Sequence, residues 1–173
     1  PALVLVELVI NGYVLFINRK SVPNIWWRVA PILIGLLIGV AIGSYILSLV
    51  HPSWVKFVTY FMLLPLILLQ AAGIRKPIKA EKAIAIPFGV GIGTLYSITT
   101  ISGPPLAVLF NNQGYVKQDF RAALGVIRVG EAVMTGIAYY FIGLYSSASM
   151  EVILYIVPSV LLGIPLGTFL IRW

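Results

Sequence analysis

The chain has 173 residues, of which 60% are hydrophobic and only 10% are charged, and its mean hydropathy is +1.02. A soluble domain carries about 25% charged residues, so this composition excludes an ordinary water-soluble domain. The net charge of +7 does not indicate a nucleic-acid partner, because the basic residues stand in short gaps between apolar stretches. There is no cysteine, which excludes disulfides and thiolate metal sites, and we expect no cofactor and no bound metal.

Apolar stretches of about 20 residues recur along the whole chain, and a helix of that length crosses the hydrocarbon layer of a bilayer. Six such units are predicted: Ala2–Ile17, Val29–Val50, Val55–Ala72, Ala83–Asn112, Ala122–Tyr145 and Met150–Ile171. The four tryptophans stand at the edges of units, where indole rings favour the headgroup layer. We therefore predict an all-α, polytopic transmembrane helical bundle that forms a single domain over residues 1–173 in a lipid bilayer.

The fourth unit, Ala83–Asn112, is too long for one ordinary span, since a single helix of that length would run about 45 Å. It is interrupted at Ser102-Gly103-Pro104-Pro105. The two prolines remove two backbone donors, and Pro104 disfavours helical geometry at Gly103. We expect a longer first piece and a short second helix, Pro104–Asn112, which either continue as one kinked span or fold back as a re-entrant hairpin.

Charged residues discriminate between these two arrangements. Basic residues in the loops at 18–28 and 75–82 predict that these loops face the cytoplasm. The hairpin places Lys117, Arg121 and Arg172 on that same side, whereas a single span places them opposite. The positive-inside rule therefore favours the hairpin.

An internal duplication relates the two halves of the chain. The segment Gly39–Ile46 resembles Gly163–Leu170, and both carry a Gly-x-x-x-Gly pair, with Gly163 standing 124 positions after Gly39. The same offset matches Glu7 with Glu131 and Gly12 with Gly136. Gly-x-x-x-Gly pairs are common in membrane helices, but paired intramembrane glutamates are not. We expect Gly39, Gly43, Gly163 and Gly167 to serve close helix packing.

The duplication predicts two repeats, with residues 1–82 forming the end of the first and residues 83–173 most of the second. With the hairpin, the second repeat runs opposite to the first across the bilayer, which is the inverted-repeat architecture of many secondary transporters. Residues 102–105 and residues 55–72 have no matching segment in the other repeat within this chain. We therefore expect the intact protein to extend beyond both ends.

The short helix after the interruption is the first candidate binding site. Gly103 and Pro104 open it, Ser102 is a possible cap, and Thr99 and Thr100 add hydroxyl groups just before it. A helix N-terminus inside a membrane offers amide donors and a partial positive charge, which suit an anion. The alternative is a kink whose hydroxyls satisfy freed carbonyls.

Three ionisable residues stand well inside the predicted spans: Glu7, Arg128 and Glu131. Such residues are costly to insert and usually face a cavity or each other. We expect Arg128 to contact the anion and Glu131 to carry a proton or orient Arg128. The alternative is a structural ion pair, since these two lie three residues apart on one helix face. Glu7 has Val4 at the position that matches Arg128, so it needs another partner or titrates.

Several segments resemble the TauE/SafE family, whose members are known as sulfite exporters and anion permeases. The likeness to its second half lies in Ile101–Val108, Gly114, Phe120-Arg121-Ala122 and Pro158 with Gly163-x-x-x-Gly167, and Trp26–Tyr45 is similar to the end of its first half. The resemblance implies a bacterial or archaeal multi-pass permease of the inner membrane for sulfite, organosulfonates or related sulfur anions. Two departures are visible. Where the family often has a run of glycines this chain has Gly103-Pro104-Pro105, and the first-half motif is absent.

We therefore predict a secondary transporter for a small anion rather than an enzyme, driven by ions or protons because no nucleotide-binding loop is present. One alternative is a non-transporting assembly subunit, which the embedded charges disfavour. Another is an intramembrane serine enzyme built on Ser102, which lacks a base because His51, the one histidine, is expected in an outer loop. The substrate, the coupling ion, the direction and a possible homo-oligomer stay open at this point.

Overall fold

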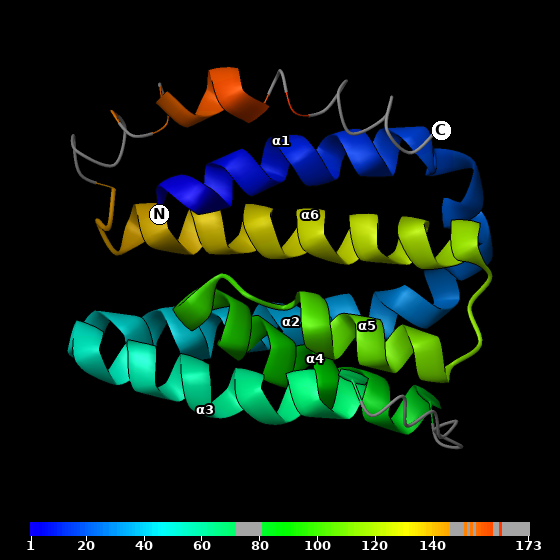
Figure 1. Cartoon of the computed structure of the whole chain (residues 1–173), viewed down its shortest axis with the longest axis horizontal. Helices are drawn as coiled ribbons and strands as arrows, with labels where there is room; N and C mark the ends of the chain where they lie inside the picture. Colours follow the sequence, from blue (N-terminus) through cyan, green and yellow to red (C-terminus); the bar gives the residue numbers. More distant parts are fainter. Residues whose placement is uncertain (72–80, 146–150, 152, 154, 161–162, 164–173) are drawn as a thin grey trace.

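The computed structural model describes residues 1–71, 81–145, 151, 153, 155–160 and 163, and this described part contains helices and no strand (Figure 1). The prediction of an all-helical protein is confirmed. The elements in chain order are α1 (Ala2–Ile17), a 3₁₀ turn η1 (Arg19–Ser21), α2 (Val22–Leu49), α3 (Pro52–Ala71), α4 (Glu81–Thr99), α5 (Gly103–Asn112) and α6 (Lys117–Phe141). The predicted sixth unit lies mostly outside the described residues.

The helix bounds depart from the apolar units mainly at polar ends. The first unit coincides with α1, but α2 begins at Val22 rather than Val29, and α6 begins at Lys117 rather than Ala122. Pro23 suits the first turn of α2, and Asp119 complements the positive end of α6. Helix α6 ends before Gly143, whose φ of +74° suits glycine at a helix end.

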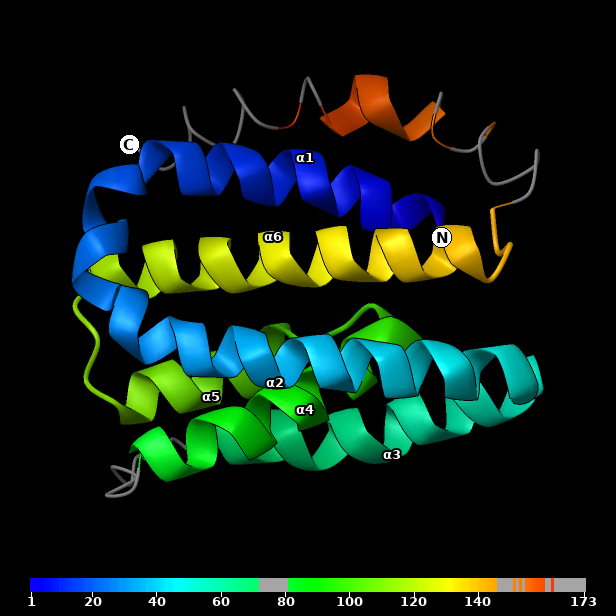
Figure 2. The same ribbon diagram turned by 180° about the vertical axis from the view of Figure 1, so that it is seen from behind.

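Helix α2 is the centre of the bundle. It packs against α4 and α6, while α1 lies along α6 (Figures 1 and 2). Side chains from α2, α4, α5 and α6 form one apolar core, which includes Val29, Leu36, Ile92, Phe110 and Ile127. Burial of this shared core fixes α5 and α6 against α2 and so positions the segment between α4 and α5.

Glycines bring the backbones of α2 and α4 into direct contact. A Cβ atom built on Gly39 would lie 2.1 Å from the carbonyl oxygen of Val90, and one on Gly43 would lie 2.6 Å from that of Thr94. The Thr94 hydroxyl also donates to the Gly39 carbonyl at 3.1 Å. The packing role predicted for Gly39 and Gly43 is confirmed.

Three further glycines take part in the same contact and were not singled out from the sequence. They are Gly35, Gly89 and Gly93, and a Cβ on each would approach a carbonyl oxygen of the facing helix within 2.6 Å. The sequence signal for them is the four-residue spacing of Gly35 with Gly39 and of Gly89 with Gly93. The role predicted for the second pair is not tested, because Gly167 lies outside the described residues and Gly163 meets nothing in the described part within 4 Å.

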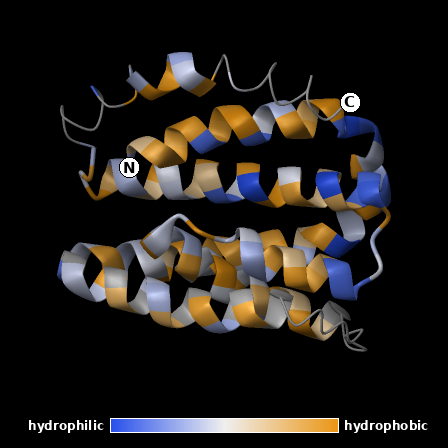
Figure 3. Ribbon diagram, viewed as in Figure 1, coloured by the Kyte–Doolittle hydropathy of each residue, from blue (hydrophilic) through white to orange (hydrophobic). Residues whose placement is uncertain are grey.

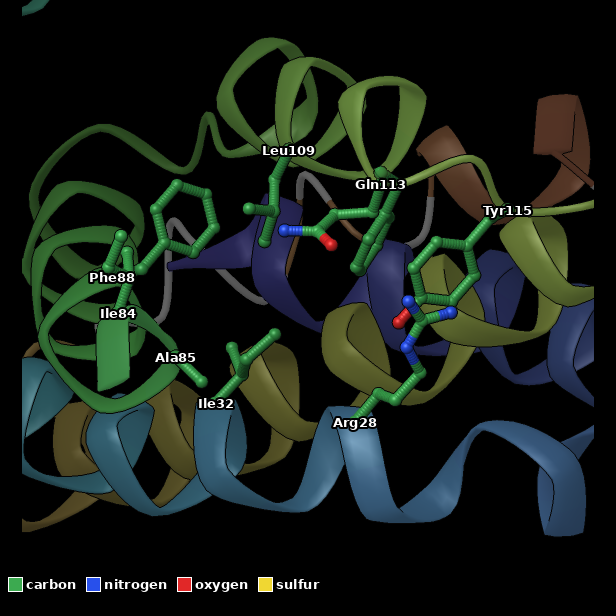
Figure 4. A pocket seen from close by; sticks show the side chains of 9 residues that line it. Arg28, Ile32, Ile84, Ala85, Phe88, Leu109, Gln113 and Tyr115 are labelled. Atoms are coloured by element: carbon green, nitrogen blue, oxygen red, sulfur yellow. The ribbon is translucent and has the colours of Figure 1, made fainter. Parts of the chain in front are cut away.

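The chain reverses between α4 and α5. Thr100, with φ of +58°, lies at the turn, and its N–H donates to the Tyr96 carbonyl at 2.6 Å. After the turn, α5 leads back toward the start of α4 (Figures 1 and 2). Consequently Phe88, near the start of α4, and Gln113, just after α5, line the same cavity (Figure 4). The fourth apolar unit is thus a helical hairpin in the folded chain.

That cavity is small, and Arg28 is one of the residues that line it. Its volume is about 10 Å³, close to the least that one water molecule needs. The guanidinium of Arg28 lies 4.5 Å from the ring centre of Tyr115 (Figure 4). The buried amide nitrogen of Gln113 has no hydrogen-bond partner among the described residues. Residues of α2, α4 and the end of α5 meet around this cavity, which is too small to hold a substrate.

Helices α1 and α6 run antiparallel. Gly125 lies against Leu15, and Gly136 lies near Val4. The basic turn η1 therefore sits at the same end of the bundle as the first residues of α6, and hydrophilic residues gather at that end (Figure 3). Among the described residues, Arg19–Leu49 and Lys117–Phe141 are long and apolar enough to cross a membrane, by length and composition.

Candidate functional site

The N-terminus of α5 is buried inside the bundle. Ser102 is fully buried, and Pro105 and Leu106 of the first turn are buried as well. Pro104 and Pro105 have no N–H, and the Leu106 N–H donates to the Ser102 carbonyl at 3.1 Å. Within the described part of the chain, the first turn therefore offers one amide without a hydrogen-bond partner, that of Gly103. The several amide donors expected from the sequence are absent here, because the two prolines that begin the helix also remove its donors.

Ser102 does not cap α5 with its side chain. Its hydroxyl donates to Oε2 of Glu131 at 2.6 Å, and α5 has no side-chain cap hydrogen bond. Ser102 therefore occupies the expected cap position, but its side chain does not form a capping hydrogen bond. A hydroxyl bound to a carboxylate forms a stronger, charge-assisted hydrogen bond than a neutral cap, which explains the choice of partner.

Arg128 brings its positive charge to the same turn. A Cβ atom built on Gly103 would lie 3.3 Å from a terminal guanidinium nitrogen of Arg128, so the absence of a side chain at 103 makes room for the arginine. Within the described part of the chain, the guanidinium makes no hydrogen bond and no ion pair, including none with Glu131. The structure thus brings together Ser102, Gly103 and Arg128, but not as the ion pair that spacing on α6 allowed.

Glu131 is fully buried on α6 and has one hydrogen bond. Among the residues that the structure describes, its second oxygen, Oε1, has no hydrogen-bond partner, and neither does the buried hydroxyl of Thr135 one turn further along the same helix. Buried polar atoms in proteins nearly always have partners, so this part of α6 is unusual. Electrostatic interactions reach Glu131 from both Arg128 and Glu7.

Glu7 on α1 is held by a residue that sequence reasoning missed. The hydroxyl of Tyr96, fully buried on α4, donates to Oε2 of Glu7 at 2.7 Å. The charges of Glu7, Arg128 and Glu131 all act on Tyr96. Four helical elements therefore converge on one polar cluster, which comprises Glu7, Tyr96, Ser102, Arg128 and Glu131. No sequence pattern links Tyr96 to Glu7.

Thr99 and Thr100 serve the turn between α4 and α5. The Thr99 hydroxyl donates to the Leu95 carbonyl at 2.8 Å and accepts from the Ile101 N–H at 3.1 Å. The Thr100 hydroxyl donates to the Thr99 carbonyl at 2.7 Å. These bonds satisfy the backbone where the helix is interrupted, and substrate contacts from these two hydroxyls stay a prediction.

The cluster holds two carboxylates, one guanidinium and two hydroxyls near a positive helix end, an arrangement suited to binding an anion and holding a proton. His51, the base that a serine enzyme would need, is exposed before α3, and the partner of Ser102 is Glu131. Among the residues that the structure describes, no group of acidic or histidine side chains could hold a metal ion.

Comparison with known proteins decides the family. The family model described as sulfite exporter TauE/SafE matches residues 1–173, which is the whole chain. The chain belongs to the TauE/SafE family. The resemblance read from the sequence is therefore confirmed, and with it the general class of membrane transport protein. No curated protein and no solved structure gives a significant match.

TauE/SafE membership also gives a context for the polar cluster. A transport protein needs a binding site within the membrane where protein groups replace the water around a polar substrate. Polar groups within membrane spans usually mark that site. In this TauE/SafE protein the cluster around Ser102 and Glu131 lies on the helical core, next to an interrupted helix.

Proposed function

We propose that this TauE/SafE protein is a secondary transporter for a small sulfur-containing anion such as sulfite or an organosulfonate. It is a multi-pass protein of the inner (plasma) membrane. The anion binds between the N-terminus of α5 and the guanidinium of Arg128, with Ser102, Gly103 and Pro104 forming the adjoining backbone. The family description supports the class of anion.

The observation that carries the proposal is the unpaired guanidinium beside Gly103. A cation within a transmembrane bundle is costly unless a counter-charge or water accompanies it. Arg128 has no protein partner in the described part of the chain, while Gly103 offers a free N–H next to it. A planar guanidinium binds two oxygens of one anion side by side, which suits the oxygens of sulfite or a sulfonate.

The α4–α5 hairpin supports a re-entrant position for the site. Because α5 leads back toward the start of α4, the basic residues at the start of α6 and those of η1 lie at one end of the bundle. Orientation by the positive-inside rule then places that end in the cytoplasm and the turn at 100–102 within the bilayer. The second repeat is inverted relative to the first in this arrangement.

Flux into proteoliposomes tests the function. The intact protein is reconstituted, and uptake of radiolabelled sulfite is compared with that of empty liposomes. We expect saturable uptake that Arg128→Gln abolishes. The matched control is Arg121→Gln, since Arg121 lies on the same helix but is exposed near its start.

Two outcomes count against the proposal. Uptake that survives in Arg128→Gln, with that variant folded and inserted, removes Arg128 from the site. Absence of uptake for sulfite and for small sulfonates by the unsubstituted protein points to the assembly-subunit alternative.

A further inference from the structure

A carboxylate of the protein already lies at the proposed anion site. Ser102 stands at the cap position of α5, and its hydroxyl binds Oε2 of Glu131 rather than the helix amides. Arg128, one turn earlier on α6, lies beside Gly103 in the first turn of α5, within 3.3 Å of where a Cβ atom at 103 would stand, and acts electrostatically on Glu131. The positive end of α5 and the guanidinium therefore face Glu131 and would face a bound anion as well.

The charges in the cluster oppose the binding of an anion. The charged or titratable groups that face Glu131 are Arg128 on α6, Glu7 on α1 and Tyr96 on α4. The buried side chains that α2 contributes are apolar, apart from Ser44. With both glutamates ionised, the cluster carries one positive and two negative charges. An incoming anion would add a further negative charge in a place shielded from water, where like charges repel strongly.

Glu131 is the group best placed to lose its charge when the anion binds. An ionised carboxylate away from water requires several hydrogen bonds, but within the described part of the chain Glu131 has one, and its Oε1 has no partner there. Glu7 is less buried and accepts a hydrogen bond from Tyr96. The hydroxyl of Thr135 lies one turn from Glu131 on α6 and also has no partner among the described residues. It offers a hydrogen-bond acceptor in the same stretch of the helix to a protonated carboxyl group.

We infer that Glu131 takes up one proton when an anion binds beside Arg128, so that this protein moves anion and proton together in the same direction. The inference rests on the proposed function. In this cycle the empty site holds Glu131 ionised with Arg128 as its counter-charge, and because Ser102 supplies its one hydrogen bond among the described residues, this charged state is costly and readily takes up a proton. In the loaded state the proton on Glu131 offsets the charge of a monovalent anion, and the net charge of the cluster is the same in both states. The proton comes from the solvent on the loading side and leaves with the anion.

The test measures proton and anion movement in the same proteoliposomes. Methanesulfonate is a suitable probe because it stays ionised across the working pH range, so that proton movement reports the protein and not the substrate. The lumen contains a pH-sensitive dye, and an inward methanesulfonate gradient is imposed without a pH gradient. Sulfite uptake is measured in parallel to establish that the preparation transports.

For the unsubstituted protein we expect acidification of the lumen with about one proton for each anion. Glu131→Gln, which resembles the protonated side chain, should exchange labelled for unlabelled anion without moving protons. Asp119→Asn is the matched control, because Asp119 is a half-buried acid in the first turn of α6, outside the polar cluster, and it should behave like the unsubstituted protein.

Three results overturn the inference. Anion uptake without lumen acidification by the unsubstituted protein refutes coupling and leaves the proposed function standing, and this result does not depend on any variant being stable. Proton movement that persists in a transporting Glu131→Gln protein removes Glu131 from the role. Absence of uptake for both methanesulfonate and sulfite overturns the proposed function itself.

Discussion

Replacing Gly89 by alanine tests the close contact between α2 and α4. A Cβ atom at 89 would lie 2.2 Å from the carbonyl oxygen of Ile32, and backbone on the facing helix cannot move as a side chain can. Ordinary contact begins at 3.4 Å, so the helices must separate by more than 1 Å. Overpacking of this kind costs about 1–3 kcal/mol. Gly91 is the matched control, because it lies two positions away on α4 and a Cβ there would meet nothing within 4 Å.

Alanine also favours the helix over glycine by up to about 1 kcal/mol, and this gain applies equally at both positions. We therefore expect Gly91→Ala to be neutral or stabilising, and Gly89→Ala to be less stable than Gly91→Ala by about 1–3 kcal/mol. For a chain of this length that difference corresponds to a Tm lower by about 2–4 °C for each kcal/mol. The Tm of both variants is measured in the same detergent by tryptophan fluorescence. Equal Tm values for the two variants would refute the contact.

Two substitutions probe the polar cluster. Ser102→Ala removes the hydrogen bond to Glu131 and should lower the free energy of unfolding by about 1.5–3 kcal/mol near neutral pH, as measured by chemical unfolding in detergent. An unchanged value at neutral pH would mean that this bond contributes nothing. Gly103→Ala places a Cβ 3.3 Å from the Arg128 guanidinium, so it should shift that side chain and raise the KM for sulfite about tenfold while the Tm stays the same. A KM equal to that of the unsubstituted protein would contradict the proximity of Gly103 to the binding site.

Much of the helical arrangement could be predicted from the sequence because the signals are local. The apolar run of α1 stops at the polar residues Asn18, Arg19 and Lys20, and its bounds agree with the structure. Pro104 and Pro105 marked the division of the fourth unit, since proline interrupts helices regardless of tertiary context. Apolar runs placed the start of α2 and of α6 too late, because membrane helices extend into polar residues at their ends.

The candidate site could be predicted in part. Arg128 and Glu131 could be predicted as site residues because ionisable side chains are costly to insert into a membrane. Both lie at the interrupted helix. Their hydrogen bonds could not be foreseen, because the partner of Glu131 is Ser102, 29 residues away, and depends on how α5 packs against α6. Tyr96 was missed for the same reason, since its partner on α1 lies 89 residues away. The loss of amide donors at α5 was readable from the two prolines, but only once the helix start was known.

Binding of sulfite to the purified intact protein tests the central claim most directly. A ligand that binds the folded state stabilises it, by about 2.7 kcal/mol at a concentration one hundred times Kd, so binding raises Tm. The unsubstituted protein and Arg121→Gln should show the same saturable rise in Tm with sulfite, and Arg128→Gln should show none. An equal rise in Arg128→Gln would contradict the claim that the anion binds at Arg128 and the N-terminus of α5.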